Sequence, residues 1–184
     1  INAQGGADVI DIGLGANIVT INVGESATTA VDAITGFNVA SASWTGASTH
    51  DDAAEFQSTG VGGALADILV FNTTGGTTTT AGVSGTAGTT ATNNVEVSAG
   101  GKVTFAAADD TLAEMLAAVV ADVTDVGVKE TVFWELGSDT YVFNNDNTAD
   151  GMVKLVGLTG VTGIDALAGS GTIGGAGFII IDGV

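Results

Sequence analysis

Several residue types are missing or rare in this chain of 184 residues, and each absence narrows what the protein can be. There is no cysteine, so disulfide bonds and thiolate metal sites are excluded. There is no arginine and there are three lysines, against 21 acidic residues. The net charge of −18 repels polyanions, which argues against nucleic acid as a partner.

Long apolar runs are also absent. No stretch approaches the roughly 18–20 apolar residues that a membrane-spanning helix needs, so we expect no membrane insertion. No basic n-region or signal-peptide pattern opens the chain, which we interpret as a fragment from the end of a larger protein. Apolar residues nevertheless make up 45% of the sequence, enough to form a buried core.

Two imperfect nine-residue units stand back to back near the start of the chain. Residues 6–14 and 15–23 both begin Gly-x-Asp/Asn-x-Ile/Val. Such a unit alternates a turn, where glycine provides positive φ, with a short strand whose inward apolar residue is Ile10 or Val19. Stacked units of this kind form a parallel β-roll whose turns bind calcium.

The turns of these units are the first candidate metal site. Calcium takes about six to eight oxygen ligands, which glycine-turn carbonyls and Asp or Asn side chains supply. Turns on one side of a roll are two units apart, so we expect Asp8 to face Ser26 and Asn17 to lie in the opposite groove. The predicted ligands are Gly6, Asp8, Asp11, Gly15, Asn17, Gly24 and Ser26. A turn-rich β segment without metal is the alternative.

A second oxygen-rich segment spans residues 144–151. It contains Asp146 and Asp150, which we add to the predicted calcium ligands, with Asn144 and Asn147 beside them. The spacing is not that of an EF-hand loop, so a solvated hairpin loop is the competing interpretation.

The single histidine, His50, stands beside Asp51, Asp52 and Glu55. One histidine cannot supply the paired histidines of a zinc site. No nucleophile motif such as Gly-x-Ser-x-Gly is present. We therefore expect a surface loop at His50 and no enzymatic activity.

Local patterns predict one helix and several strands. Thr111 and Glu114 form a capping box, and the apolar residues that follow, up to Val123, recur at helical spacing. Residues 131–136 and 139–143 flank Gly137-Ser138, which predicts a hairpin. Further strands are expected at 65–71, 95–97, 102–105 and from Met152 on.

The two nine-residue units resemble the repeats of RTX proteins, which Gram-negative bacteria export by type I secretion. Residues 32–37 resemble the exit segment that closes an RTX roll, and residues 132–143 and 153–161 resemble the terminal segment of these proteins. Among RTX relatives, the composition is most similar to that of surface-layer (S-layer) proteins.

The resemblance implies a mainly β fold: short calcium-binding β-roll or parallel β-helix turns, then a β-rich terminal domain with one amphipathic helix. We predict an RTX-like remnant over 1–37, a Thr/Gly-rich β region over 38–100 and a terminal domain with the secretion signal over 101–184. The implied function is a secreted, calcium-dependent S-layer subunit at the cell surface.

The partners implied by the resemblance are copies of the same chain, the type I secretion machinery and, as a further candidate, cell-surface polysaccharide. Two alternatives stay open. One is the export and folding module of an RTX exoenzyme. The other is an adhesin or carbohydrate-binding module, with Trp44, Trp134 and Tyr141 as a candidate sugar platform. Packing in the core or in a hairpin is the competing interpretation of these aromatics.

Overall fold

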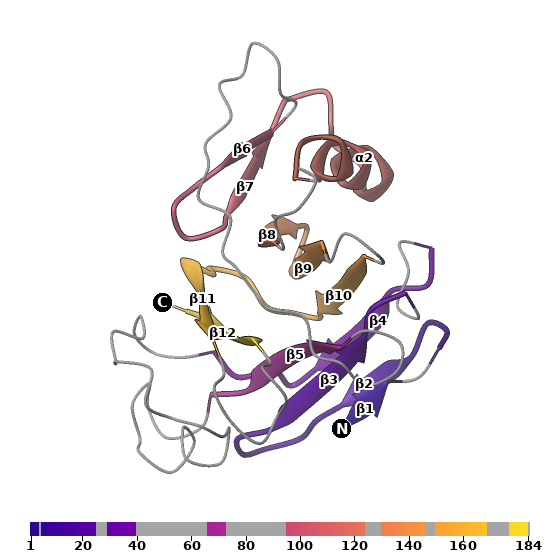
Figure 1. Ribbon diagram of the computed structural model, residues 1–184, viewed down its shortest axis with the longest axis vertical. Helices are drawn as coiled ribbons and strands as arrows, with labels where there is room; N and C mark the ends of the chain where they lie inside the picture. Colours follow the sequence, from indigo (N-terminus) through magenta and orange to yellow (C-terminus); the bar gives the residue numbers. More distant parts are fainter. Residues whose placement is uncertain are drawn as a thin grey trace.

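The computed structural model describes residues 1–3, 5–24, 29–39, 66–72, 95–123, 130–145, 150–168 and 177–183. These residues form two five-stranded sheets, a two-stranded hairpin and a helix (Figure 1). The prediction of a mainly β chain with a helix is confirmed. The segments around Trp44 and His50, together with Ser26 and Asp146, lie outside the described residues.

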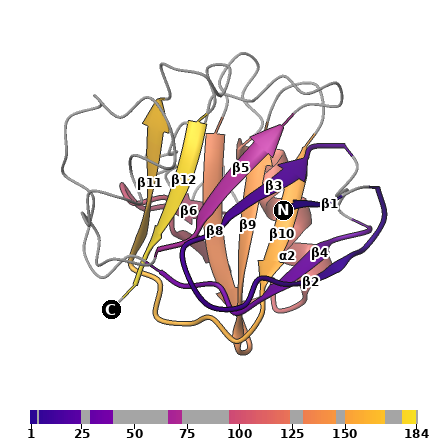
Figure 2. The same ribbon diagram turned by 90° about the horizontal axis from the view of Figure 1, so that it is seen from below.

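Each five-stranded sheet combines strands from distant parts of the chain. Sheet A consists, in spatial order, of β1 (Asn2–Ala3), β3 (Ile18–Asn22), β5 (Ile68–Asn72), β12 (Gly177–Asp182) and β11 (Gly163–Ala168). Sheet B consists of β2 (Val9–Asp11), β4 (Asp32–Thr35), β10 (Gly151–Leu155), β9 (Asp139–Asn145) and β8 (Glu130–Leu136). In Figure 2, β3 and β5 of sheet A pass in front of the central strands of sheet B, and residues of both sheets share one core.

The first five strands alternate between the two sheets and pair in parallel. We call each successive pair of strands, one in each sheet, a coil. Asn2 pairs with Thr20, 18 residues later, which is the spacing of two nine-residue units. The separation grows to 24 residues between Val9 and Ala33, and to 50 between Ile18 and Ile68. The turns therefore lengthen along the chain while the strands stay in register.

The later strands are mostly antiparallel. β8 and β9 form the predicted hairpin around Gly137, whose φ of 67° is the left-handed conformation that glycine tolerates. β10 then pairs antiparallel with β9 on one side and parallel with β4 on the other. This strand joins the hairpin to the coils in one sheet.

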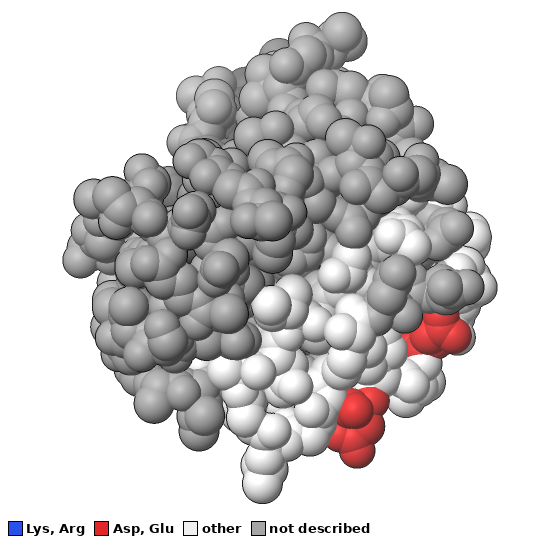
Figure 3. Space-filling model, turned by 60° about the horizontal axis from the view of Figure 1, so that its bottom comes forward, with Lys and Arg blue, Asp and Glu red and all other residues white. Residues whose placement is uncertain are grey.

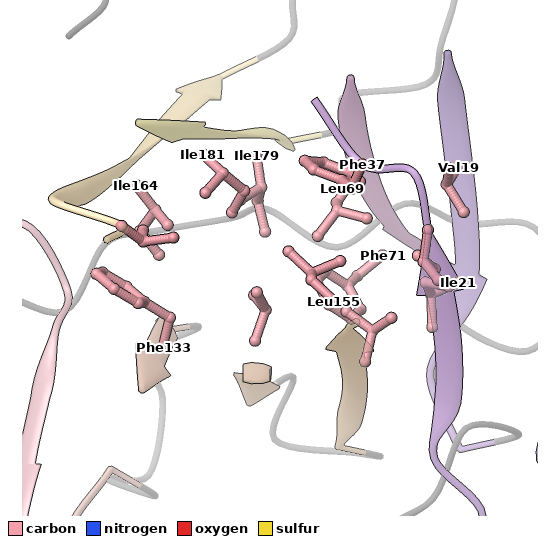
Figure 4. Packing of buried hydrophobic residues seen from close by; sticks show 14 of the residues in the cluster. Val19, Ile21, Phe37, Leu69, Phe71, Phe133, Leu155, Ile164, Ile179 and Ile181 are labelled. Carbon is pink, nitrogen blue, oxygen red and sulfur yellow. The ribbon is translucent and has the colours of Figure 1, made fainter. Parts of the chain in front are cut away.

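Sheet B lies between two cores, and its side chains alternate between them. Phe133 and Val142 face sheet A, whereas their neighbours Trp134 and Phe143 face the opposite side. The core between the sheets is shown in Figure 4, where Ile21, Leu69, Phe71, Ile179 and Ile181 of sheet A meet Phe133 and Leu155 of sheet B. Both cores consist mainly of buried aliphatic and aromatic side chains.

The second core is covered by α2 (Leu112–Val123) and by the hairpin of β6 (Val95–Val97) and β7 (Val103–Phe105) (Figure 1). The predicted capping box is present, because Glu114 N–H donates to Thr111 Oγ1 at 3.3 Å and Thr111 N–H donates to Glu114 Oε2 at 3.2 Å. The helix places Ala118 and Val119 against sheet B, as its apolar spacing predicts.

Gly151 begins β10 at a point where no side chain fits. A Cβ there would lie 2.8 Å from Val23 Cγ1 and 3.0 Å from the Phe71 ring, both fully buried. We expect Gly151→Ala to lower the free energy of unfolding by about 1–3 kcal/mol, because the packed neighbours cannot withdraw. Urea unfolding measures this. Gly163→Ala is the matched control, since its nearest atoms lie 3.7 Å away. Equal stability of the two variants would contradict the tight contact.

Candidate functional site

The turns of the parallel coils gather at two ends of the stack. The residues that precede β2 and β4 lie at one end, and the residues that follow these strands lie at the other. We call them the Asp8 end (residues 5–8, 23–24 and 29–32) and the Asn17 end (residues 12–17, 36–39 and 66–67). The predicted calcium ligands of the repeats are divided between the two ends.

A buried carboxylate organises the Asn17 end. Asp67 is completely buried, and its Oδ1 accepts hydrogen bonds from Asn17 N at 2.6 Å and Asn17 Nδ2 at 2.9 Å. Its Oδ2 accepts from Asn38 N at 2.6 Å and Asn38 Nδ2 at 3.2 Å. Hydrogen bonds to an ionised acceptor are about twice as strong as neutral ones. Four N–H groups therefore offset the free-energy cost of burying this carboxylate.

The same residues bring together the two ends of the long connection between β4 and β5. Asp67 N–H donates to Asn38 O at 2.9 Å, and Ile68 N–H donates to Asn17 O at 2.9 Å. Residues 38 and 67 thus lie side by side although 29 positions separate them. This arrangement fixes the register of β5 against β3 across the long connection.

The side chain of Asn17 takes part in the hydrogen bonds of the turn. Its Nδ2 donates to Asp67 Oδ1 and to Gly15 O at 3.0 Å. The role of Asn17 as a calcium ligand stays a prediction. Sequence reasoning missed Asp67 and Asn38. An acid inside an otherwise apolar strand pattern, Leu65 to Phe71, was the available signal for Asp67. Asn38 carried no comparable signal.

The Asp8 end contains described residues of both predicted calcium segments. Asp8 N–H donates to Oδ1 of the buried Asp32 at 2.9 Å, and Ala33 N–H donates to Asp8 O at 2.8 Å. Gly24 N–H donates to Asp150 O at 3.1 Å. Asp8, Gly24 and Asp150 therefore belong to one end of the stack, although the sequence separates them widely.

The three glycines among the predicted ligands lie in turns with the expected backbone, whereas Asp11 is the last residue of β2. Gly6, Gly15 and Gly24 have φ of 120°, 105° and 82°, which non-glycine residues rarely adopt. Asp11 is exposed, and its Oδ1 accepts a hydrogen bond from Gly13 N at 3.1 Å. The prediction that these glycines form turns is thus confirmed for the described residues.

Within the described part of the chain, no group of three or more His, Asp or Glu side chains is placed to hold a metal ion. Calcium also takes backbone carbonyl and amide oxygens, which such groups do not include. The calcium site therefore stays a prediction. Among the described helices, none is long and apolar enough to cross a membrane.

Two lysines form ion pairs with carboxylates of sheet B. Lys154 Nζ lies 2.7 Å from Asp139 Oδ2, and Lys102 Nζ lies 3.5 Å from Glu135 Oε2. The hydrogen bond from Lys154, followed by that from Gly157 N–H, lowers the pKa of Asp139. The same contact with Asp139 raises the pKa of Lys154.

The aromatic pair in the hairpin packs inside the protein. Trp134 stacks on Tyr141 with ring centroids 5.8 Å apart, and Phe105 meets Trp134 edge-on at 5.8 Å. Trp134 and Tyr141 are 1% and 7% exposed, so their rings are not open to a sugar. Packing in the hairpin, the competing interpretation of these residues, describes what the structure shows.

No protein-family model matches this chain, and no curated protein or solved structure matches it either.

The Asp67 contacts predict a large loss of stability on substitution. We expect Asp67→Asn to lower the free energy of unfolding by about 2–4 kcal/mol, because its amide would face buried N–H donors that need an acceptor. Chemical denaturation measures the change. Asp11→Asn is the matched control, since Asp11 is exposed and accepts a single bond. A loss no greater than that of the control would show that the four bonds contribute little.

The Lys154–Asp139 pair predicts a pH dependence. The stabilisation from Asp139 is fully present above the unfolded pKa of about 3.9 and is lost as the pH falls through the lower folded pKa. We expect Asp139→Asn to cost about 1 kcal/mol at neutral pH. The difference from the wild type should shrink in acid, as urea unfolding at several pH values would show. A difference that stays constant in acid would contradict the shift. Asp110→Asn, at an exposed site, is the control.

Proposed function

We propose that this chain is a calcium-dependent structural module of a secreted surface protein of the S-layer type, and that its first strands are a short β-roll. One observation carries the proposal. Strands β1 to β4 alternate between two sheets with parallel pairing, and the first register step equals two nine-residue units. Glycines with positive φ occupy the intervening turns. This arrangement is the one that an RTX-like repeat requires.

The charge of the chain supports a role for a divalent cation. The net charge is −18, and a compact state with that charge is destabilised by self-repulsion. Within the described ranges, the side-chain ion pairs are those of Lys102 and Lys154. Bound calcium would offset repulsion that the few lysines leave in place. The Asp8 end, which contains Asp8, Gly24 and Asp150, is our proposed location.

The proposed mechanism is coupling between calcium and folding. Calcium is scarce in a cytoplasm, so the acidic chain stays loose during export. Outside the cell, at roughly millimolar calcium, binding stabilises the folded state by mass action. The folded module then associates with copies of itself, and type I secretion machinery and cell-surface polysaccharide are its further proposed partners.

The test is thermal unfolding with parallel light scattering, in chelator and in about 10 mM calcium. A site with a dissociation constant of about 1 mM stabilises by about 1.4 kcal/mol at that concentration, which raises the Tm by about 3–6 °C. Ordered assembly should accompany the rise. Magnesium at equal ionic strength controls for screening of charge.

A double variant tests whether the calcium-induced rise in Tm depends on the Asp8 end. Asp8→Asn with Asp150→Asn should abolish most of the calcium-induced rise in Tm, whereas Glu96→Gln, an exposed acid on β6, should leave it unchanged. Stabilisation without assembly would favour the alternative, the export module of an exoenzyme. A Tm that is the same in chelator and in calcium would contradict the proposed calcium site.

A further inference from the structure

The turn between β6 and β7 contacts both five-stranded sheets. Phe133 N–H of β8 donates to Gly101 O at 2.9 Å, and Ile164 N–H of β11 donates to Gly100 O at 3.0 Å. In the described part of the chain, β8 is the last strand of sheet B and β11 the last strand of sheet A. We call this turn, residues 98–102, the strap. Two neighbouring carbonyl groups of the strap thus accept hydrogen bonds from the edges of two different sheets (Figure 1).

The strap lies beside the core between the sheets. Phe133 and Ile164 are 0% and 3% exposed and belong to that core, and Figure 4 shows both at the same side of it. Gly101, which accepts from Phe133, is also buried. The N–H groups of an edge strand can pair with another chain unless a loop covers them. Here the strap binds the outer N–H groups of Phe133 and Ile164.

A lysine and a glutamate add side-chain contacts between the strap and the sheets. Lys102 Nζ lies 3.5 Å from Glu135 Oε2 on β8 and 3.5 Å from Val161 O. Val161 N–H in turn donates to Glu135 Oε1 at 3.0 Å. On the face that Figure 3 shows, the charged atoms of the described residues are acidic, so a lysine is a rare partner in this chain. Both side chains of the ion pair are partly exposed, and its contribution is therefore small.

The strap carries hydrogen bonds of its own. Ser98 N–H donates to Lys102 O, and Gly101 N–H donates to Ser98 O, both at 2.9 Å. Ser98 Oγ also accepts from Lys102 N–H at 2.9 Å. In addition, β6 and β7 form a separate two-stranded sheet that is not part of sheet A or sheet B. The strap can therefore leave the two sheets without losing the bonds that define its shape.

We propose that the strap opens and closes as a unit while both five-stranded sheets stay folded. Closed, it joins the edge of sheet A to the edge of sheet B; open, it frees the N–H groups of Phe133 and Ile164 together. Opening breaks these two backbone hydrogen bonds and the contacts of Lys102, and openings of this size need less free energy than global unfolding. None of the predicted calcium ligands takes part, so the inference is independent of the proposed function.

Amide hydrogen exchange of the 184-residue chain, followed by NMR, tests the proposal. We expect the amides of Phe133 and Ile164 to have the same protection although they belong to different sheets, because one opening exposes both. We also expect this protection to be lower than that of Leu69 and Val142 in the inner strands β5 and β9. Independent fraying of β8 and β11 would give Phe133 and Ile164 different values and would overturn the proposal.

A substitution in the strap should change both amides together. A Cβ on Gly100 would lie 3.3 Å from Gly163 Cα and 3.5 Å from Thr162 O, which are backbone atoms. Gly100→Val should therefore speed exchange at Phe133 and Ile164 about tenfold or more, and leave Leu69 and Val142 unchanged. The matched control is Ala99→Val, which adds a branched side chain at an exposed position of the same turn and should change neither pair of amides.

A second variant keeps the proposal testable if Gly100→Val does not fold. Lys102→Gln removes the ion pair with Glu135 and should speed exchange at Phe133 and Ile164 about two- to fivefold. Lys154→Gln removes the other described lysine pair, makes no contact with the strap and should leave the ratio between these amides and the inner ones unchanged. Equal protection of the strap-bound and inner amides, or equal acceleration of all of them by the strap variants, would overturn the proposal.

Discussion

The buried carboxylate of Asp67 holds the coils of this protein in register. It accepts four hydrogen bonds from Asn17 and Asn38, although 29 positions of the sequence separate Asn38 from Asp67. Burial of an ionised group is costly unless several donors surround it. The donors are the backbone and side-chain N–H groups of Asn17 and Asn38, which lie in the turns. The hydrogen bonds that stabilise the buried charge therefore also position β3 against β5.

Sheet B joins the coils to the hairpin, because β10 pairs with β4 on one side and with β9 on the other. Its two faces support separate cores, one against sheet A and one beneath α2 and the β6–β7 hairpin. Among the described glycines, Gly151 has the closest neighbours, since Val23 and Phe71 leave no room for a side chain. The coils and the C-terminal strands thus share one interior.

Electrostatics and topology act on the same surfaces. An acidic chain with three lysines can pair few of its carboxylates internally, and Lys102 and Lys154 serve local contacts in sheet B. The carboxylates at the Asp8 end are then expected to respond to cations and salt. This is why calcium-dependent folding is an expectation for this protein.

Short-range patterns in the sequence determined the local elements. The Thr111–Glu114 capping box, the Gly137-Ser138 hairpin and the glycine turns of the nine-residue units all depend on neighbours a few positions apart. The calcium ligands, the function and the division into three regions stay predictions. Only the tertiary structure shows that Asp67 accepts hydrogen bonds from two separate turns, and that Asp8 and Asp150 lie at the same end of the coils. Those placements depend on strand pairing between residues far apart in sequence, which local periodicity does not encode.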